Sequence, residues 1–193
     1  MKRVMLLGDS IRMSYQAPVA RRLADEAEVW GPEENCQYSL YTLSALPRWL
    51  GQFQEPAVVH WNNGIHDVGH NPHRAPVQMP LEVYRANVGH ILDVLLPTRA
   101  RVVWATMTPV HPQRPFRPDQ WSWRNGEIDA YNAAALEVVT ARGIPVNDLH
   151  GLVQADPDGL LSEDQLHLSE AGVEACADAV AAAVRRELTE TGS

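Results

Sequence analysis

A chain of 193 residues with a formal net charge of -8 suits one domain with one core, and the negative charge disfavours nucleic acid as a partner, because phosphate binding requires a basic face. No run approaches the roughly 18 apolar residues of a membrane span, and the apolar run after Met1-Lys2-Arg3 is only about four residues, short for a signal peptide. We therefore expect a single cytoplasmic domain over residues 1–193 that does not associate with membranes. The two cysteines, Cys36 and Cys176, are expected to be free and reduced.

Strand and helix patterns alternate along the chain. In chain order, we predict a strand at 4–7, a helix at 14–26, a strand at 27–31, a short helix that begins at Thr42, a strand at 57–61, a helix at 80–96, a strand at 101–106, a helix at 123–141, a strand at 144–146 and a helix at 170–188. Pro145 predicts an edge position for the last strand, and Ser169 is the expected cap of the last helix. Alternating strands and helices form βαβ units, so we predict an α/β fold with a parallel sheet of about five strands.

Polar segments follow the strands at the edge where an open parallel sheet binds its ligands, outside the carboxyl ends of the strands. These segments are Gly8-Asp9-Ser10-Ile11, the 33–39 loop, the 62–67 turn and the 107–122 loop. A serine at such a position has an open hydroxyl with backbone N–H groups nearby. Ser10 is therefore a candidate nucleophile.

Asp164-Gln165-Leu166-His167 precedes the last helix and can fold back toward Ser10. A serine hydroxyl needs an imidazole to take its proton, and the imidazole needs a carboxylate to fix its tautomer. An Asp three residues before a His can contact Nδ1 and leave Nε2 free for Ser10. The same short motif also fits a surface histidine with a loop acid, so it does not decide the matter alone.

Together, Gly8-Asp9-Ser10-Ile11, Gly64-Ile65-His66-Asp67 and Asp164-Gln165-Leu166-His167 resemble blocks I, III and V of the SGNH (GDSL) hydrolases, over almost the whole chain. The resemblance implies a flavodoxin-like three-layer α/β/α sandwich. It also implies ester hydrolysis without a cofactor, through a Ser-His-Asp triad. In this chain Ser10 would be the nucleophile, His167 the base and Asp164 the acid that orients the base.

The oxyanion hole is where the chain departs from that family, which uses the N–H of the nucleophile, a block II glycine and a block III asparagine. Ser10 supplies the first donor. Gln37 stands where glycine is usual, although a backbone donor does not require glycine. His66 replaces the asparagine, and a neutral imidazole can donate one hydrogen bond. Asn62 and Asn63 are rival donors, of which we favour Asn63, and the sequence leaves open which of Asn63 and His66 faces the oxyanion.

Other residues have two interpretations each. Asp9 and Asn62 are candidate substrate-binding residues, although Asp9 and Asp67 are also expected to organise turns by accepting backbone N–H bonds. Trp121 and Trp123 either pin the 107–122 loop by aromatic packing or form a substrate-binding flap over Ser10.

Two further groups could carry different chemistry. His66, Asp67, His70 and His73 have a spacing that permits metal binding, although we expect no metal because the proposed triad needs none. Asp148 and His150 form a rival acid–base pair, for which no nucleophile is apparent.

We expect a serine esterase that hydrolyses small-molecule esters with short acyl groups, acetyl above all, with a carbohydrate as the preferred alcohol. Two alternatives remain: a metal-dependent hydrolase that uses His66, His70 and His73, and a non-catalytic carbohydrate-binding relative, because block III is altered. The sequence leaves the oligomeric state open.

Overall fold

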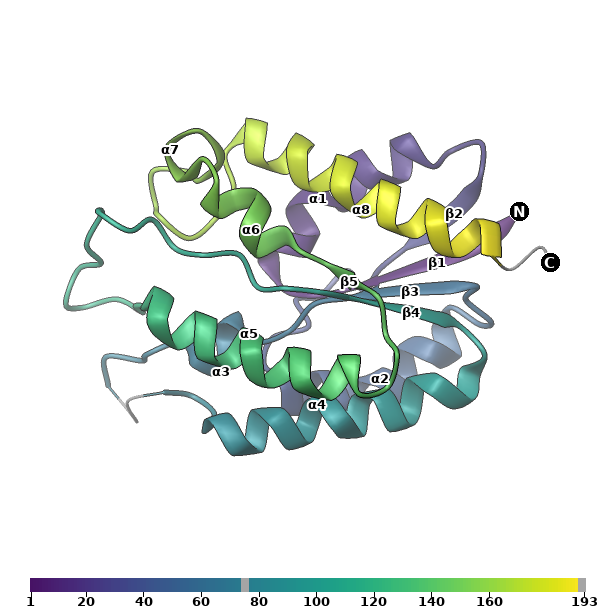
Figure 1. Cartoon of the computed structure of the whole chain (residues 1–193), viewed down its shortest axis with the longest axis horizontal. Coiled ribbons are helices and arrows are strands. Elements are labelled where there is room, and N and C mark those ends of the chain that lie inside the picture. Colours follow the sequence, from purple (N-terminus) through teal and green to yellow (C-terminus); the bar gives the residue numbers. More distant parts are fainter. Residues whose placement is uncertain (74–76, 191–193) are drawn as a thin grey trace.

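One sheet of five parallel strands forms the centre of the computed structural model, which describes residues 1–73 and 77–190 (Figure 1). The strands are β1 (Lys2–Leu7), β2 (Ala27–Trp30), β3 (Val58–Trp61), β4 (Arg101–Ala105) and β5 (Val146–Asn147). Their order is β2-β1-β3-β4-β5, which is the flavodoxin-like doubly wound order. The predicted parallel α/β sheet is confirmed, with β5 at its edge. The strand predicted at 144–146 instead covers Val146–Asn147, so Pro145 lies just before it.

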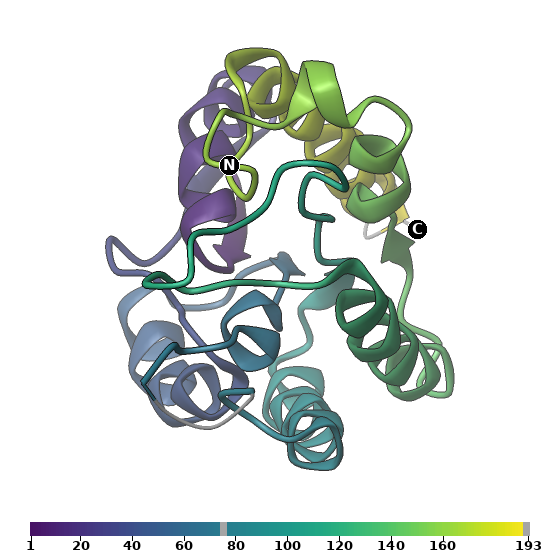
Figure 2. The same cartoon turned by 90° about the vertical axis from the view of Figure 1, so that its left-hand side faces the viewer.

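Helices cover both faces of the sheet (Figures 1 and 2). On one face, α1 (Ser10–Arg22) packs against α8 (Glu170–Glu190), with α6 (Leu149–Gln154) and α7 (Pro157–Leu160) beside α8. On the other face, α4 (Leu81–Leu95) packs between α2 (Ser39–Gln52) and α5 (Asn125–Thr140). The short α3 (Ile65–Val68) follows β3, and the 3-10 helix η1 (Leu96–Thr98) follows α4. The three-layer arrangement is therefore the one predicted.

Side chains of β1 alternate between two apolar cores, because successive residues of a strand point to opposite faces. Val4 and Leu6 lie in the core under α1 and α8. Met5 and Leu7 lie in the core under α2, α4 and α5. All four side chains are fully buried, so β1 is central and its carboxyl end is held rigidly.

The first helix begins earlier than the sequence predicts. α1 starts at Ser10 rather than at Ser14, and it ends at Arg22. Asp9 caps it, because Oδ1 of Asp9 accepts a hydrogen bond of 2.9 Å from the N–H of Ile11. The cap places the candidate nucleophile in the first turn of the helix.

The other helix ends show which local signals were correct. α2 begins at Ser39 rather than at Thr42, whose hydroxyl instead donates to the carbonyl of Cys36 (2.8 Å). The predicted cap of α8 is present, because Ser169 Oγ accepts from the N–H of Gly172 (3.1 Å). The helices α3, α6, α7 and η1 were not predicted, since elements this short show no amphipathic period.

The strands β1 and β3 end at the same register, and β4 extends one residue further, to Ala105. Leu7 pairs with Trp61, and Trp61 pairs with Trp104. Figure 2 looks onto this carboxyl edge, where the connection between β4 and α5 and the segment before α8 run across the ends of the strands. The edge is therefore where the polar segments meet.

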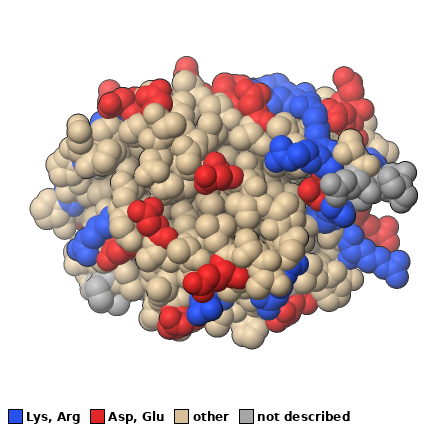
Figure 3. All heavy atoms as spheres, in the orientation of Figure 1, with Lys and Arg blue, Asp and Glu red and all other residues tan. Residues whose placement is uncertain are grey.

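Figure 3 shows acidic and basic side chains interspersed over one face, with a large uncharged area between them. Most Lys and Arg side chains on that face lie toward the end that carries the N-terminus. Within residues 1–73 and 77–190, none of the helices combines the length and apolar character needed to cross a membrane.

Candidate active site

Ser10, His167 and Asp164 form a hydrogen-bonded chain at the carboxyl edge of the sheet. Ser10 Oγ lies 2.9 Å from Nε2 of His167. Nδ1 of His167 lies 2.6 Å from Oδ2 of Asp164. In this arrangement Nε2 can accept the hydroxyl proton while the carboxylate holds a proton on Nδ1.

Donors of its own loop surround Asp164. Oδ1 accepts hydrogen bonds from Ser162 Oγ (2.8 Å), from the N–H of Leu166 (3.1 Å) and from the N–H of His167 (2.9 Å). Partial burial acts to raise the pKa of Asp164, but these donors and the imidazole of His167 outweigh it and hold the pKa well below its usual value. The carboxylate therefore stays ionised beside the imidazole.

The 107–122 loop braces the segment that carries Asp164 and His167. The N–H of His111 donates to the carbonyl of Gln165 (2.9 Å), and Arg114 donates to the carbonyl of Ser162 (3.0 Å). The ring of His111 also contacts Asp158 of α7 (2.9 Å). The loop thus supports the segment that carries Asp164 and His167, a role that the sequence alone does not indicate.

A buried arginine joins the first turn of α1 to the 32–37 loop. Arg12 is 2% exposed and donates to the carbonyls of Pro32 (2.9 Å), Glu34 (2.9 Å) and Gly8 (3.3 Å). A Cβ at Gly8 would lie 2.7 Å from Cβ of Arg12, so only glycine permits this approach. The 32–37 loop is therefore fixed relative to Ser10 and the first turn of α1.

Gln37 adopts the left-handed conformation that glycine would adopt readily, with φ at 52°. Its N–H, however, donates to Oδ1 of Asn35 (2.7 Å). Gln37 was expected to be the second oxyanion donor, but this N–H already has a side-chain acceptor. The reason is the turn formed by Asn35, whose carbonyl oxygen bonds the backbone two residues on.

Asn63 and Asn62 both have structural partners. Asn63 is fully buried; its Oδ1 accepts from Trp61 Nε1 (2.8 Å) and its Nδ2 donates to the carbonyl of Gln37 (3.0 Å). Asn62 donates to the carbonyl of Ala105 (2.9 Å), which joins the ends of β3 and β4. Neither side chain lines the cavity of about 340 Å³ that opens beside Ser10. The structure thus places Asn63 as a support of the Gln37 turn, not as the expected rival donor.

His66, on α3, does reach the cavity at Ser10. Its Nε2 lies 3.4 Å from Nδ2 of Asn35. Burial lowers the pKa of His66; the negative charge of Asp9 opposes this, and His167 adds to it. The imidazole is therefore neutral near pH 7 and carries a single N–H donor.

Both motif aspartates organise backbone, as the sequence analysis expected. Asp9 caps α1 and does not line the cavity at Ser10. Asp67 is buried and accepts from the N–H and the hydroxyl of Ser39, the latter at 2.5 Å. Burial raises the pKa of Asp67 to about 7, although the Ser39 hydrogen bonds act to lower it. Asp67 thus joins α3 to the start of α2.

A cavity of about 340 Å³ opens at the Ser10 hydroxyl. Its lining comprises the hydrogen-bonded Ser10 and His167, one further histidine and five apolar side chains: His66, Ile11, Ile65, Trp121, Trp123 and Leu166.

Trp121 and Trp123 pack against each other and against α3, as the first interpretation expects, and both line the cavity at Ser10. Their rings stack at 6.3 Å, and Trp123 Nε1 donates to the carbonyl of Ile65 (2.6 Å), which pins the 107–122 loop against α3. The same rings line the cavity, so the packing also shapes the space beside Ser10.

The rival sites do not assemble. His70 pairs with Glu127 of α5 (2.6 Å), and His73 is exposed. Across residues 1–73 and 77–190, no three His, Cys, Asp or Glu side chains are grouped so that they could hold a metal ion. Asp148 caps α6, and the ring of His150 bonds the carbonyl of Met107 (2.9 Å), so these two do not form an acid–base pair with each other.

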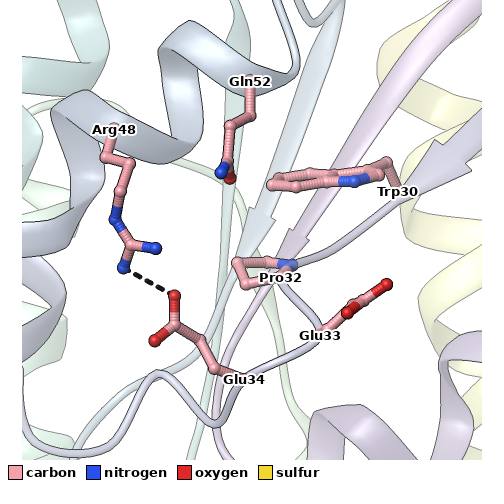
Figure 4. A pocket seen from close by; sticks show the side chains of 6 residues that line it. All are labelled: Trp30, Pro32, Glu33, Glu34, Arg48 and Gln52. Carbon is pink, nitrogen blue, oxygen red and sulfur yellow. Dashed lines mark hydrogen bonds and ion pairs between the residues drawn. The ribbon is translucent and has the colours of Figure 1, made fainter.

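A second hollow, of about 510 Å³, lies on the far side of the 32–37 loop (Figure 4). Its lining comprises Trp30, Pro32, Glu33, Glu34, Arg48 and Gln52. None of the triad residues lines it. Figure 4 shows Glu34 of this loop reaching toward Arg48 of α2, and the two are 2.6 Å apart.

Comparisons with known proteins identify the family and the fold. A sequence model of the GDSL-like Lipase/Acylhydrolase family matches residues 6–175. A lipase/acylhydrolase from Enterococcus faecalis has a similar structure, with a TM-score of 0.79 and 21% identity, covering 96% of each chain. An acetyl xylan esterase, AlAXEase, has a TM-score of 0.78 and 18% identity, over 94% of this chain and 99% of its own.

The psychrotrophic esterase EstA from Pseudoalteromonas sp. has a TM-score of 0.73 and 12% identity, over 98% of this chain and 100% of its own. At these identities the structures show a shared fold. A search of the curated proteins found no match. The match of the family over most of the chain carries the assignment: the chain is a carboxylic ester hydrolase and belongs to the GDSL-like lipase/acylhydrolase family.

Proposed function

We propose that this protein hydrolyses esters through a Ser10–His167–Asp164 triad. The observation that carries the proposal is the continuous chain of hydrogen bonds, 2.9 Å from Ser10 Oγ to His167 Nε2 and 2.6 Å from His167 Nδ1 to Asp164 Oδ2. Ser10 Oγ attacks the ester carbonyl as Nε2 takes its proton. His167 then gives that proton to the leaving alcohol, which forms the acyl-enzyme.

Water completes the reaction. His167 takes a proton from the water as its oxygen attacks the acyl carbonyl, and returns the proton to Ser10 Oγ when the acid leaves. In both steps the carbonyl oxygen becomes negative. The N–H of Ser10 is free to stabilise it, because the first N–H groups of a helix have no acceptor within the helix. We propose the neutral ring of His66 as the second donor.

The cavity supports an apolar acyl group. Its volume of about 340 Å³ is roughly that of ten water molecules in the liquid. An acetyl group fills only a small part of it. We therefore propose short acyl groups as substrates: acetyl, as the sequence analysis expects, and also butyryl and hexanoyl, for which the cavity has room. The stacked rings of Trp121 and Trp123 also offer a face for a sugar alcohol.

Hydrolysis of p-nitrophenyl acetate, butyrate and hexanoate by the wild type, Ser10→Ala and Ser14→Ala tests the triad. Ser14 lies on the same helix and bonds the carbonyl of Ile11, so its variant is the matched control. We expect Ser10→Ala to lower kcat by more than 10³-fold and Ser14→Ala to leave it unchanged. Ester hydrolysis retained by Ser10→Ala would refute the proposal.

Labelling by a fluorophosphonate separates the enzyme from a non-catalytic relative. The reagent reacts with an activated serine hydroxyl, so labelling is expected in the wild type and in Ser14→Ala, and not in Ser10→Ala. Absence of label on the folded wild type would favour a binding protein.

A further inference from the structure

Where the family usually has asparagine in block III, this chain has His66. A histidine donor requires one particular tautomer of the ring, a requirement that an amide does not have. A side-chain amide always has two N–H donors, whereas a neutral imidazole has one, on either Nδ1 or Nε2. His66 can act at an oxyanion only if the nitrogen that faces the cavity holds the proton. Some neighbouring group must therefore select the tautomer.

The orientation of the Asn35 amide follows from its backbone partner. The N–H of Gln37 donates to Asn35 at 2.7 Å, and only the amide oxygen can accept it. The NH₂ end of Asn35 is thereby turned toward His66, with Nδ2 at 3.4 Å from Nε2. Because Nδ2 is a donor, Nε2 must be the acceptor, and the single proton of the neutral ring lies on Nδ1.

Nδ1 is the nitrogen that remains available. It makes no hydrogen bond to any residue in the described ranges, and it is not among the buried polar atoms left without a partner. His66 lines the cavity that also contains Ser10 and His167. His66 and Ser10 therefore border the same space, and Nδ1 is the ring nitrogen whose proton is not aimed at Asn35.

Asn35 is held rigidly by its neighbours in the chain. On one side, the carboxylate of Glu34 accepts from Arg48 (2.6 Å) and from Trp49 Nε1 (2.9 Å), as Figure 4 shows in part. On the other side, the N–H of Cys36 donates to the carbonyl of Gly8 (3.1 Å). The amide is thus presented to His66 from a turn anchored to both α2 and the end of β1.

We propose that Asn35 is a positioning residue of the oxyanion hole, which holds His66 as the Nδ1–H tautomer so that this N–H stabilises the carbonyl oxygen during attack by Ser10. The inference rests on the proposed esterase function. Asn35 does not touch the substrate in this scheme, and no proton moves between Asn35 and His66. Asn35 and His66 together replace the single block III asparagine.

Ring-nitrogen NMR of the ¹⁵N-labelled protein tests the tautomer without any substrate. Long-range ¹H–¹⁵N spectra distinguish a protonated from an unprotonated ring nitrogen, and His66→Asn assigns the signals. We expect the proton on Nδ1 in the wild type and in Ser10→Ala. In Asn35→Asp, which keeps an acceptor for Gln37 but loses the donor to His66, we expect a proton on Nε2. A wild-type ring protonated on Nε2 alone would overturn the proposal.

Kinetics test the consequence. We expect Asn35→Ala to lower kcat by about 10- to 100-fold with little change in KM, because a group supporting an oxyanion donor acts mainly in the transition state. Asn71→Ala is the matched control, since Asn71 makes the same kind of turn bond, to His73, and does not line the cavity. Its kcat is expected to equal that of the wild type.

A double-mutant cycle separates positioning from a general structural role. An asparagine at 66 has its own donors and needs no tautomer, so Asn35→Ala should change kcat less than 3-fold in the His66→Asn background. The same loss in both backgrounds would refute the proposal. Failure of the proposed Ser10 triad would instead appear as ester hydrolysis retained by Ser10→Ala, whatever the tautomer of His66.

Discussion

Asp164→Asn tests the role of the acid in the triad. Three donors, from Ser162, Leu166 and His167, converge on Oδ1 of Asp164, so the oxygen of the new amide will take this position. Its NH₂ group will then replace Oδ2, opposite Nδ1 of His167. An N–H donor there makes Nδ1 an acceptor and moves the ring proton to Nε2, where it blocks proton transfer from Ser10.

The expected loss follows from the tautomer and from the exposure of the pair. The same substitution in a serine protease triad lowers kcat by about 10⁴-fold, which corresponds to about 5 kcal/mol of activation free energy. The side chains of His167 and Asp164 are 42% and 55% exposed, so water replaces part of the lost charge stabilisation. We therefore expect kcat to fall by about 10³- to 10⁴-fold.

Initial rates with p-nitrophenyl butyrate, with folding verified by circular dichroism, provide the assay. Asp156→Asn is the matched control, because Asp156 caps α7 through the N–H of Gly159 (3.1 Å) and belongs to no catalytic chain. Its kcat is expected to stay within 2-fold of the wild type. A folded Asp164→Asn enzyme that loses less than 10-fold would refute the reasoning that Asp164 sets the tautomer of His167.

Two further predictions concern the cavity wall and a buried carboxyl. Trp123→Ala removes a ring that lines the cavity, so it should raise KM for the hexanoate ester more than for the acetate ester; an equal change for both would contradict an acyl role for this wall. Burial raises the pKa of Asp67 to about 7, above the value of about 3.9 in the unfolded chain, so the unfolded state loses this proton first and stability falls as pH rises between these values. Urea titrations give the free energies of unfolding of Asp67→Asn and of the wild type. The value for Asp67→Asn minus the value for the wild type should increase by at most about 1.4 kcal/mol per pH unit from pH 4 to pH 7. A constant difference would show that Asp67 is ionised throughout.

Local patterns were sufficient for most of the fold. The apolar run of residues 4–7 and the three- and four-residue spacing in 80–96 depend on neighbours in the chain, and both appear as predicted in β1 and α4. The sequence pattern predicts the start of α1 at Ser14, four residues late, because the apolar spacing begins there, whereas the N-cap residue type at Asp9 marks the true start. Short helices such as α3 could not be predicted, because four residues give no period.

The oxyanion region shows where prediction from sequence stops. Asn35 and Gln37 are near neighbours, and the turn between them could have been proposed from the preference of asparagine for such turns. The hydrogen bond from Asn63 to the carbonyl of Gln37 could not have been predicted, because it joins two loops that follow different strands. A side-chain amide can donate to a substrate or to a carbonyl distant in the sequence, and only the tertiary packing around it decides which.

The sequence by itself determined the parallel sheet, the edge that carries the polar loops, and Ser10, Asp164 and His167 as the residues to consider, because periodicity and short motifs are local properties of the chain. Only the tertiary structure decided that Asn63 supports a turn, that the N–H of Gln37 is already bonded, and that Asn35 lies against His66. The physical reason is that each polar group can form only a few hydrogen bonds, as donor or as acceptor. Which partner receives them depends on loops that folding brings together from distant parts of the sequence.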